Sequence, residues 1–167
     1  MLVREITPAD AEEFVKLKQQ VEESSEYMLW EAGERKANPD QQRKMIERIE
    51  SDENSTIFGA EEEGKLIGFL MAIGGNARRN KHSVYIVIGI LKESRGNGVG
   101  TQLFYELEKW ALTHQIHRLE LTVVTQNVAA VSLYKKMGFE IEGTKRHSLL
   151  INGVYVDEFY MSKLSKV

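Results

Sequence analysis

One stretch of the chain decides its fold, and it reads Ile86-Val87-Ile88-Gly89-Ile90-Leu91-Lys92-Glu93-Ser94-Arg95-Gly96-Asn97-Gly98-Val99-Gly100-Thr101-Gln102-Leu103-Phe104. It begins with an apolar run interrupted by a single glycine, which is typical of a buried strand. Three glycines then alternate with other residues, and glycine permits a left-handed backbone and a close approach to a ligand. Leu103 and Phe104 open an amphipathic pattern. The stretch therefore predicts a strand, a tight glycine-rich turn and a helix.

The turn is also a predicted anion site. The first amide groups of a helix have no acceptor within the helix, and the helix dipole places partial positive charge there. Phosphate is a frequent occupant of such a position. Arg95 adds a fixed charge with paired donors. We therefore expect Arg95 to bind a phosphate group together with the residues that follow it, Gly96, Asn97, Gly98, Val99, Gly100 and Thr101.

Several nucleotide-binding families use a glycine-rich turn, and the spacing separates them. A phosphate-loop NTPase needs two glycines with four residues between them, followed by Lys and Ser or Thr, and no such run is present. A nicotinamide-dinucleotide site needs a third glycine where Thr101 stands, although Glu120 lies near the position of the ribose-binding acid. The dinucleotide reading therefore stays open only as a weak alternative.

Two motifs carry a more specific resemblance. The order Arg95-x-x-Gly98-x-Gly100 closely resembles the acetyl-CoA pyrophosphate loop of the GNAT superfamily of N-acetyltransferases. Further along, a second family motif, Asn-x-x-Ala-x-x-x-Tyr-x-x-x-Gly-Phe, is matched at Asn127, Ala130, Tyr134, Gly138 and Phe139. Two motifs in the right order are much more specific than either alone.

The resemblance implies acetyl-CoA as cofactor and assigns roles to particular residues. The strand before the turn would pair through its backbone at Gly89, Ile90 and Leu91 with the pantetheine arm. Asn127, Ala130 and Tyr134 would also contact the cofactor, and Asn127 suits a helix N-cap as well. The end of the chain resembles a subgroup that includes ribosomal-protein N-terminal, spermidine and small-molecule acetyltransferases, and it does not choose among their acceptors.

Tyr134 is the expected general acid. A phenol with an ordinary pKa near 10 stays protonated at neutral pH and can donate to a developing thiolate. The alternative is that Tyr134 only fills the core beside Leu133. The second motif favours catalysis or contact with the pantetheine arm.

The acceptor side of the site is less determined. In the family that the chain resembles, the variable region after the first helix forms part of the acceptor site. The resemblance therefore makes base candidates of Glu22, Glu23, Glu26 and Glu31, and it implies that Tyr27 and Trp30 wall an acceptor pocket. The alternative for each carboxylate is a charge that only faces solvent. The alternative to a carboxylate base is a chain of water molecules that takes the proton of the amine. Tyr85 and His82 are weaker candidates. The expected substrate-binding residues are Glu26, Tyr27, Trp30, Glu31 and Tyr85.

The remaining patterns predict a single domain over residues 1–167, a mixed α/β fold with a central, mainly antiparallel sheet flanked by helices. Residues 82–91 form a nearly continuous apolar run, which predicts a central strand covered on both faces. Glu63-Gly64 and Asn152-Gly153 predict hairpin turns. Strands are expected at residues 3–6, 55–61, 66–73, 82–91, 118–124, 139–144 and 148–163, and helices after Thr7, after Asn38, at 98–114 and after Asn127.

Composition narrows the class of protein. The chain has 167 residues, a net charge of −3 and no cysteine, so disulfides and thiolate sites are excluded. We expect no metal site, no nucleic-acid partner and no membrane partner, and a cytoplasmic location. The basic cluster at residues 78–82 reads either as a solvated loop or as a rim that assists the cofactor phosphates.

These observations lead to one expectation and its rivals. We expect an acetyl-CoA-dependent N-acetyltransferase in which a small-molecule or peptide amine attacks the thioester directly. The rival from another class is a non-catalytic acyl-CoA-binding sensor or interaction module of the same fold. Exposed strands near the C-terminus make a homodimer possible.

Overall fold

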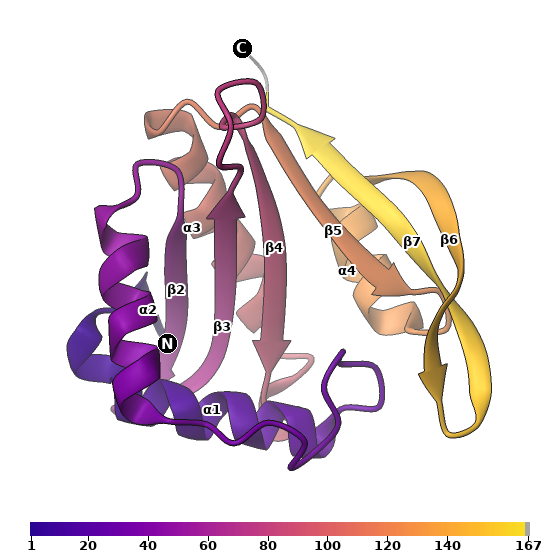
Figure 1. Cartoon of the computed structure of the whole chain (residues 1–167), viewed down its shortest axis with the longest axis horizontal. Coiled ribbons are helices and arrows are strands. Elements are labelled where there is room, and N and C mark those ends of the chain that lie inside the picture. Colours follow the sequence, from indigo (N-terminus) through magenta and orange to yellow (C-terminus); the bar gives the residue numbers. More distant parts are fainter. Residues whose placement is uncertain (166–167) are drawn as a thin grey trace.

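The strand that enters the glycine-rich turn, β4 (Ser83–Ile90), lies at the centre of a seven-stranded sheet in a computed structural model that describes residues 1–165 (Figure 1). The strand order is β1-β2-β3-β4-β5-β7-β6. All neighbours are antiparallel except β4 and β5, which are parallel. The predicted mixed, mainly antiparallel sheet is therefore confirmed. The other strands are β1 (Leu2–Glu5), β2 (Thr56–Glu62), β3 (Lys65–Gly74), β5 (Arg118–Val124), β6 (Glu140–Ile151) and β7 (Val154–Leu164).

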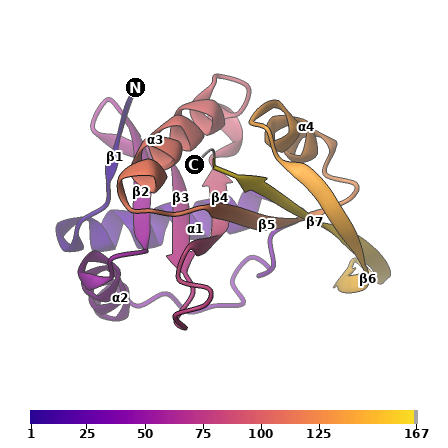
Figure 2. The same cartoon turned by 90° about the horizontal axis from the view of Figure 1, so that it is seen from above.

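Helices cover both faces of this sheet, as Figure 2 shows from above. One face carries α1 (Ala11–Ser24) and α2 (Pro39–Ser51), and the other carries α3 (Val99–Thr113) and α4 (Val128–Lys136). The core between these layers includes fully buried Phe14, Phe69 and Phe104. None of the helices in residues 1–165 has the length and hydropathy of a membrane span.

Local chemistry explains where the first two helical segments begin. Asp10 accepts a hydrogen bond from the Thr7 amide at 2.8 Å and pairs with both terminal nitrogens of Arg4. These contacts cap a short 3-10 helix (Pro8–Asp10) that leads directly into α1. The hydrogen bonds from Arg4 hold the pKa of the Asp10 carboxyl below its usual range. Before α2, the Asn38 side chain accepts from the Asp40 amide at 2.8 Å. Both starts follow the capping signals of the sequence.

The two predicted hairpin turns are confirmed. Glu63 and Gly64 have φ angles of 51° and 78°, and Asn152 and Gly153 have φ angles of 50° and 78°. Consecutive left-handed residues are the requirement of a type I′ turn, which matches the twist of the strands it joins.

The expected break between two C-terminal strands at residues 145–147 is wrong. The strand β6 continues through them, and its pairing with β7 shifts between Lys145 and Leu149. His147 is left-handed with φ 50°, and its amide donates to Asp157 Oδ1 at 2.8 Å. A local irregularity in the register absorbs the extra residues, so the strand bends without ending.

The expectation that β4 is covered on both faces is also wrong in part. Val84 and Ile86 are buried, whereas Tyr85 and Val87 on the opposite face are 41% and 37% exposed. On that face α1 reaches only the far end of the strand, where Val21 lies against Gly89. An apolar run shows that a strand is central, but it does not show how far a helix extends over each face.

Gly89 marks a close approach to neighbouring side chains, and the β3–β4 register runs past it without a bulge. A Cβ at this position would lie 2.6 Å from Phe69 Cε1 and 2.9 Å from Val21 Cγ1. We expect Gly89→Ala to destabilise the fold by about 1–3 kcal/mol, because the buried ring and valine must move. Urea denaturation measures this loss.

Gly143→Ala is the matched control, since its Cβ would meet only Tyr160 Cδ2 at 3.9 Å within another strand. Gly143→Ala should lower the free energy of unfolding much less than Gly89→Ala. Equal losses for the two variants would contradict the close-packing explanation.

Candidate functional site

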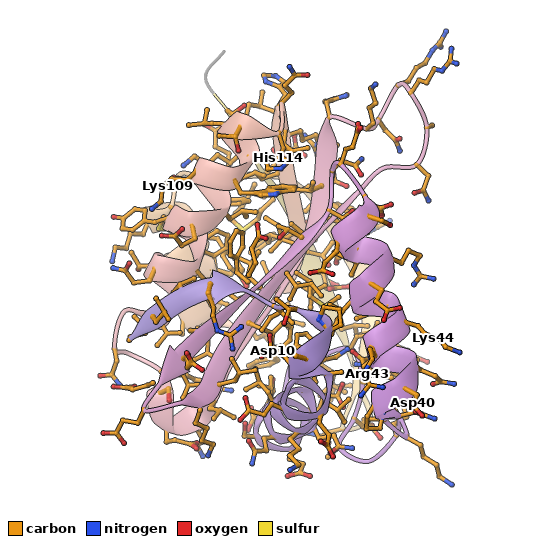
Figure 3. The ribbon with its side chains drawn as sticks, turned by 90° about the vertical axis from the view of Figure 1, so that its left-hand side faces the viewer. Asp10, Asp40, Arg43, Lys44, Lys109 and His114 are labelled. Carbon is orange, nitrogen blue, oxygen red and sulfur yellow. The ribbon has the colours of Figure 1, made fainter. Side chains whose placement is uncertain are left out.

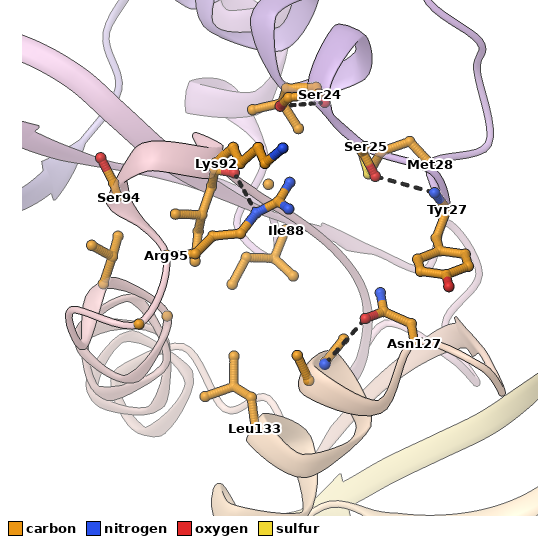
Figure 4. A pocket seen from close by; sticks show the side chains of 18 of the residues that line it. Ser24, Ser25, Tyr27, Met28, Ile88, Lys92, Ser94, Arg95, Asn127 and Leu133 are labelled. Atoms are coloured by element: carbon orange, nitrogen blue, oxygen red, sulfur yellow. Dashed lines mark hydrogen bonds between the residues drawn. The ribbon is translucent and has the colours of Figure 1, made fainter.

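A cavity of about 590 Å³ opens beside the end of β4. It is lined by the last residues of β4, the glycine-rich turn with the start of α3, one side of α4, and the segment that follows α1 (Figure 4). All of the segments that the sequence analysis connected with the cofactor thus meet around one space.

The cavity exists because β4 and β5 separate. The two strands pair only from Ser83 to Tyr85 against Arg118 to Glu120, and beyond that point they diverge (Figure 1). The end of β4 therefore has no strand on its β5 side, while β3 pairs with it on the other side. Ile88, Gly89 and Ile90 line the cavity along this free edge. Such an edge offers backbone groups to an extended ligand.

The glycine-rich turn forms a cradle of unpaired amides. Gly96 and Gly98 are left-handed, with φ 79° and 80°, and a Cβ at either would meet no atom within 4 Å. Within residues 1–165, the amides from Gly96 to Thr101 have no backbone acceptor, and the Gln102 amide is the first that does, donating to the Gly98 carbonyl. Six amides at a helix N-terminus make an anion site.

Three cations border this cradle. Arg95, Lys92 and Lys136 line the same cavity. Arg95 Nε donates to the Ile90 carbonyl at 3.3 Å, so the guanidinium group lies across the end of β4 (Figure 4). Lys136 Nζ lies 3.5 Å from Thr101 Oγ1. The charges and the amides together fit the phosphates of a coenzyme A group.

The sequence analysis missed Lys92 and Lys136. Lys136 belongs to the last turn of the second-motif helix, far along the chain from the glycine-rich turn. Close packing of α4 on α3 brings the two together, since a Cβ on Gly100 would lie 2.7 Å from Leu133 Cδ2. The signal in the sequence was a basic residue two positions after Tyr134, but only tertiary packing shows what it faces.

Tyr134 lies on α4 with its ring in the core and its side chain lining the cavity. The ring packs edge-on against Phe104 at 5.8 Å and lies 6.2 Å from Phe139. No other described residue forms a hydrogen bond with its hydroxyl group. Burial, with a smaller contribution from Tyr85, raises the pKa of Tyr134 above its ordinary value. Core packing and a role in the cavity are therefore compatible at this residue.

Asn127 and Ala130 also line the cavity. Asn127 is the N-cap of α4, and its side-chain oxygen accepts from the Ala130 amide at 3.3 Å. The side-chain oxygen of Asn127 is therefore already bonded at the start of α4. The side-chain nitrogen of Asn127 remains available as a donor at the cavity wall.

The structure divides the expected acceptor residues. Glu26 and Tyr27 line the cavity together with Ser24, Ser25 and Met28, whereas Trp30 and Glu31 are not part of its lining. Tyr85 stands apart from the lining too, and its hydroxyl pairs with Thr122 Oγ1 at 2.7 Å on the open face of β4 and β5. Leu91 and Asn97 of the expected cofactor set likewise lie outside the lining.

The reading of the basic cluster as a rim for the cofactor phosphates is wrong. Residues 78–82 precede β4, whereas the glycine-rich turn follows it. A strand of this length separates its ends by roughly 25 Å. The cluster therefore belongs to the loop at the opposite end of the sheet (Figure 1).

The comparisons with known proteins agree with this geometry. Residues 19–139 match the model of the Acetyltransferase (GNAT) family. The L-amino acid N-acetyltransferase AaaT of Escherichia coli (strain K12) is 34% identical over 61% of this chain and 64% of its own length. The streptothricin acetyltransferase of Escherichia coli matches over 52% of its length, so the chain spans between half and two thirds of these curated relatives.

Solved structures match over the whole chain. A GNAT-family acetyltransferase from Streptococcus pneumoniae has 30% identity and a TM-score of 0.94, with 99% of each chain covered. The yncA protein of Salmonella typhimurium, solved with acetyl-CoA, shares the fold at a TM-score of 0.86 and 17% identity, over 98% of this chain and 92% of its own. The chain therefore belongs to the GNAT family of acetyltransferases.

Proposed function

We propose that residues 1–167 form a single acetyl-CoA-dependent N-acetyltransferase domain that transfers an acetyl group to a primary amine by direct attack. The observation that carries the proposal is that one cavity is lined both by Gly96 and Gly98 to Thr101, whose amides are unpaired, and by Tyr134. Groups that suit phosphate binding and a phenol that suits thiol chemistry thus line the same space.

The chain supplies binding and position, while acetyl-CoA when bound supplies the activated acyl thioester. The amides of Gly96 to Thr101, with Arg95, Lys92 and Lys136, would hold the phosphates. Backbone groups of Ile88 to Ile90 and the Asn127 amide would align the arm. Positioning of two reactants in this way accounts for a large part of the acceleration in transfer reactions.

Tyr134 is proposed to hold a proton at Oη for the leaving sulfur. Since burial raises its pKa, the phenol stays protonated across the physiological range. An ordinary thiol has a pKa near 8.5, so complete transfer from such a phenol would be uphill. The hydroxyl group therefore acts best as a hydrogen-bond donor that stabilises the developing thiolate.

The amine must lose its proton before it attacks. Of the carboxylates proposed for this step, Glu26 is the one that lines the cavity. Glu22 is instead paired with Arg35 at 2.5 Å. We propose that Glu26, or water ordered beside it and Tyr27, takes the proton. A carboxylate at this wall also favours an acceptor that carries a positive charge.

Thiol release tests the proposal. The protein is incubated with acetyl-CoA and a panel of spermidine, L-amino acids, streptothricin and peptides with free amino termini, acceptors chosen from the names of its relatives. We expect release that depends on one class of amine, with the acetylated product identified by mass spectrometry. Tight acetyl-CoA binding without release across the panel would favour the sensor.

We also propose that the protein is located in the cytoplasm.

We further propose that two copies of the chain form a homodimer. The β6–β7 hairpin extends beyond the rest of the sheet, and β6 is an edge strand (Figure 1). The exposed apolar side chains of this hairpin include Ile141, Leu150, Val154, Tyr155 and Tyr160. Exposed edges with apolar side chains favour pairing between chains. Sedimentation velocity should show a dimer, and a monomer at every working concentration would refute it.

A further inference from the structure

The segment between α1 and α2 forms one wall of the cavity and then leaves it. Ser25, Glu26, Tyr27 and Met28 line the cavity, whereas the part from Trp30 to Arg35 lies outside it. The whole connection from Ser25 to Asn38 contains no helix or strand. A connection of this length keeps a fixed position only where side chains attach it to the rest of the fold.

Arg35 makes such an attachment. Its Nη2 donates to Glu22 Oε1 of α1 at 2.5 Å. The Glu22 side chain is only 7% exposed, while that of Arg35 is 40% exposed. A buried carboxylate is costly without a paired donor, so the fold strongly favours the arrangement in which Arg35 lies on Glu22. The ion pair thus ties the outer end of the segment to the helix from which it departs.

Three further contacts connect the residues of the outer part of the segment with one another. The Arg35 guanidinium carbon lies 4.9 Å from the centroid of the Trp30 ring, a cation–π contact within the segment. Between them, the Glu31 amide donates to Glu34 Oε2 at 3.0 Å and the Glu34 amide donates to the Glu31 carbonyl. The part from Trp30 to Arg35 is therefore a closed turn with a single ionic attachment, and the wall residues precede it directly.

The surroundings of Arg35 show that its charge acts on α1. Lys18 lies one turn before Glu22, and burial first, then the charge of Arg35, lower the pKa of Lys18 to about 8. Glu22 opposes this shift. Glu22 thus lies near two cations, and its hydrogen bond is with Arg35.

We propose that Arg35 is a positioning residue for the amine acceptor, which holds Glu26 to Met28 as a wall of the cavity by binding Glu22. The proposal rests on the proposed acetyltransferase function for its kinetic consequence, but the attachment itself does not. It also gives Glu22 a role other than catalytic base.

Arg35→Met removes the donor and keeps much of the side-chain volume, and Arg35→Lys retains a charge that can still reach Glu22. Arg43→Met is the matched control, because Arg43 pairs with Asp40 at 2.8 Å on the outer surface of α2, away from the cavity (Figure 3). All three are compared with the unmodified chain for the KM of the most active amine of the panel, kcat, acetyl-CoA affinity and cleavage by a glutamyl endopeptidase. This protease can cut the segment after Glu26, Glu31 and Glu34.

We expect Arg35→Met to raise the amine KM about fivefold or more, with acetyl-CoA affinity changed less than about twofold, since the released wall residues weaken acceptor binding. The kcat should fall as well, because Glu26, the proposed base, belongs to that wall. Cleavage within the segment should accelerate in Arg35→Met, partly recover in Arg35→Lys and remain unchanged in Arg43→Met. Equal cleavage of the Arg35→Met and Arg43→Met variants would overturn the attachment. Faster cleavage with an unchanged amine KM would overturn the positioning role.

The two proposals fail differently. An unmodified chain that releases no thiol with any amine would refute the proposed function, and the cleavage comparison would still decide whether Arg35 fixes the segment. If the unmodified chain releases thiol and the Arg35 and Arg43 variants have the same amine KM and the same rate of cleavage, the positioning role alone is refuted.

Discussion

Replacing Gly98 with valine is expected to lower the affinity for acetyl-CoA by about 100-fold or more, because several charge-assisted hydrogen bonds from the cradle are lost together. Gly98 is left-handed with φ 80°, a conformation in which a β-branched residue is strained. The new side chain would occupy space that is now free within 4 Å of its Cβ, at the mouth of the amide cradle.

Thermal melts with and without acetyl-CoA measure both the loss of stability and the loss of acetyl-CoA affinity in Gly98→Val, since a ligand that binds the folded state raises the melting temperature. Gly64→Val is the matched control. Gly64 has φ 78° and equally free surroundings, but it lies in the β2–β3 turn away from the cavity. Both variants should lose roughly 1–2 kcal/mol of stability from backbone strain, and only Gly98→Val should lose the ligand-induced shift. Equal ligand-induced shifts in both variants would show that the turn does not bind the cofactor.

Tyr134→Phe should lower kcat about 100-fold while acetyl-CoA affinity changes little, because the hydroxyl group is proposed to act on the charge that develops at sulfur. Removal of the hydroxyl group leaves no partner unpaired among the described residues. The ring keeps its edge-on contact with Phe104. The stability of the variant should therefore match that of the unmodified chain within about 0.5 kcal/mol.

Tyr105→Phe provides the comparison for this second prediction. Tyr105 also lies on a helix, but it is 49% exposed and is not part of the cavity lining. Loss of the Tyr105 hydroxyl group should leave the steady-state rate of thiol release unchanged. A Tyr134→Phe variant that turns over as fast as Tyr105→Phe with every acceptor would remove Tyr134 from the acid role and leave it a core residue.

Much of the fold could be predicted because its signals are local. The glycines of the turn and the pairs Glu63-Gly64 and Asn152-Gly153 require backbone angles that few other residues adopt. The caps before α1 and α2 act within a few residues. The sheet order could be expected only through the resemblance, since no local signal states that β7 lies between β5 and β6.

The site was less predictable where it depends on packing between distant segments. Tyr85 and Val87 are exposed because α1 covers only the far end of β4 on their face of the sheet, and no residue of β4 indicates how far that helix extends. Lys136 reaches the glycine-rich turn because α4 packs on α3. Glu22 and Arg35 meet through an irregular segment without periodicity, so the sequence presents Glu22 as a base candidate and gives no sign that it pairs with Arg35.

Calorimetric titration of the unmodified chain with acetyl-CoA, in parallel with NADH and ATP, decides whether the glycine-rich turn binds this cofactor. We expect selective binding of acetyl-CoA at one site per chain, with NADH and ATP bound far more weakly, since the cavity joins a phosphate cradle to a free strand edge and Tyr134. Absence of acetyl-CoA binding, or tighter binding of NADH, would contradict the account of residues 95–101.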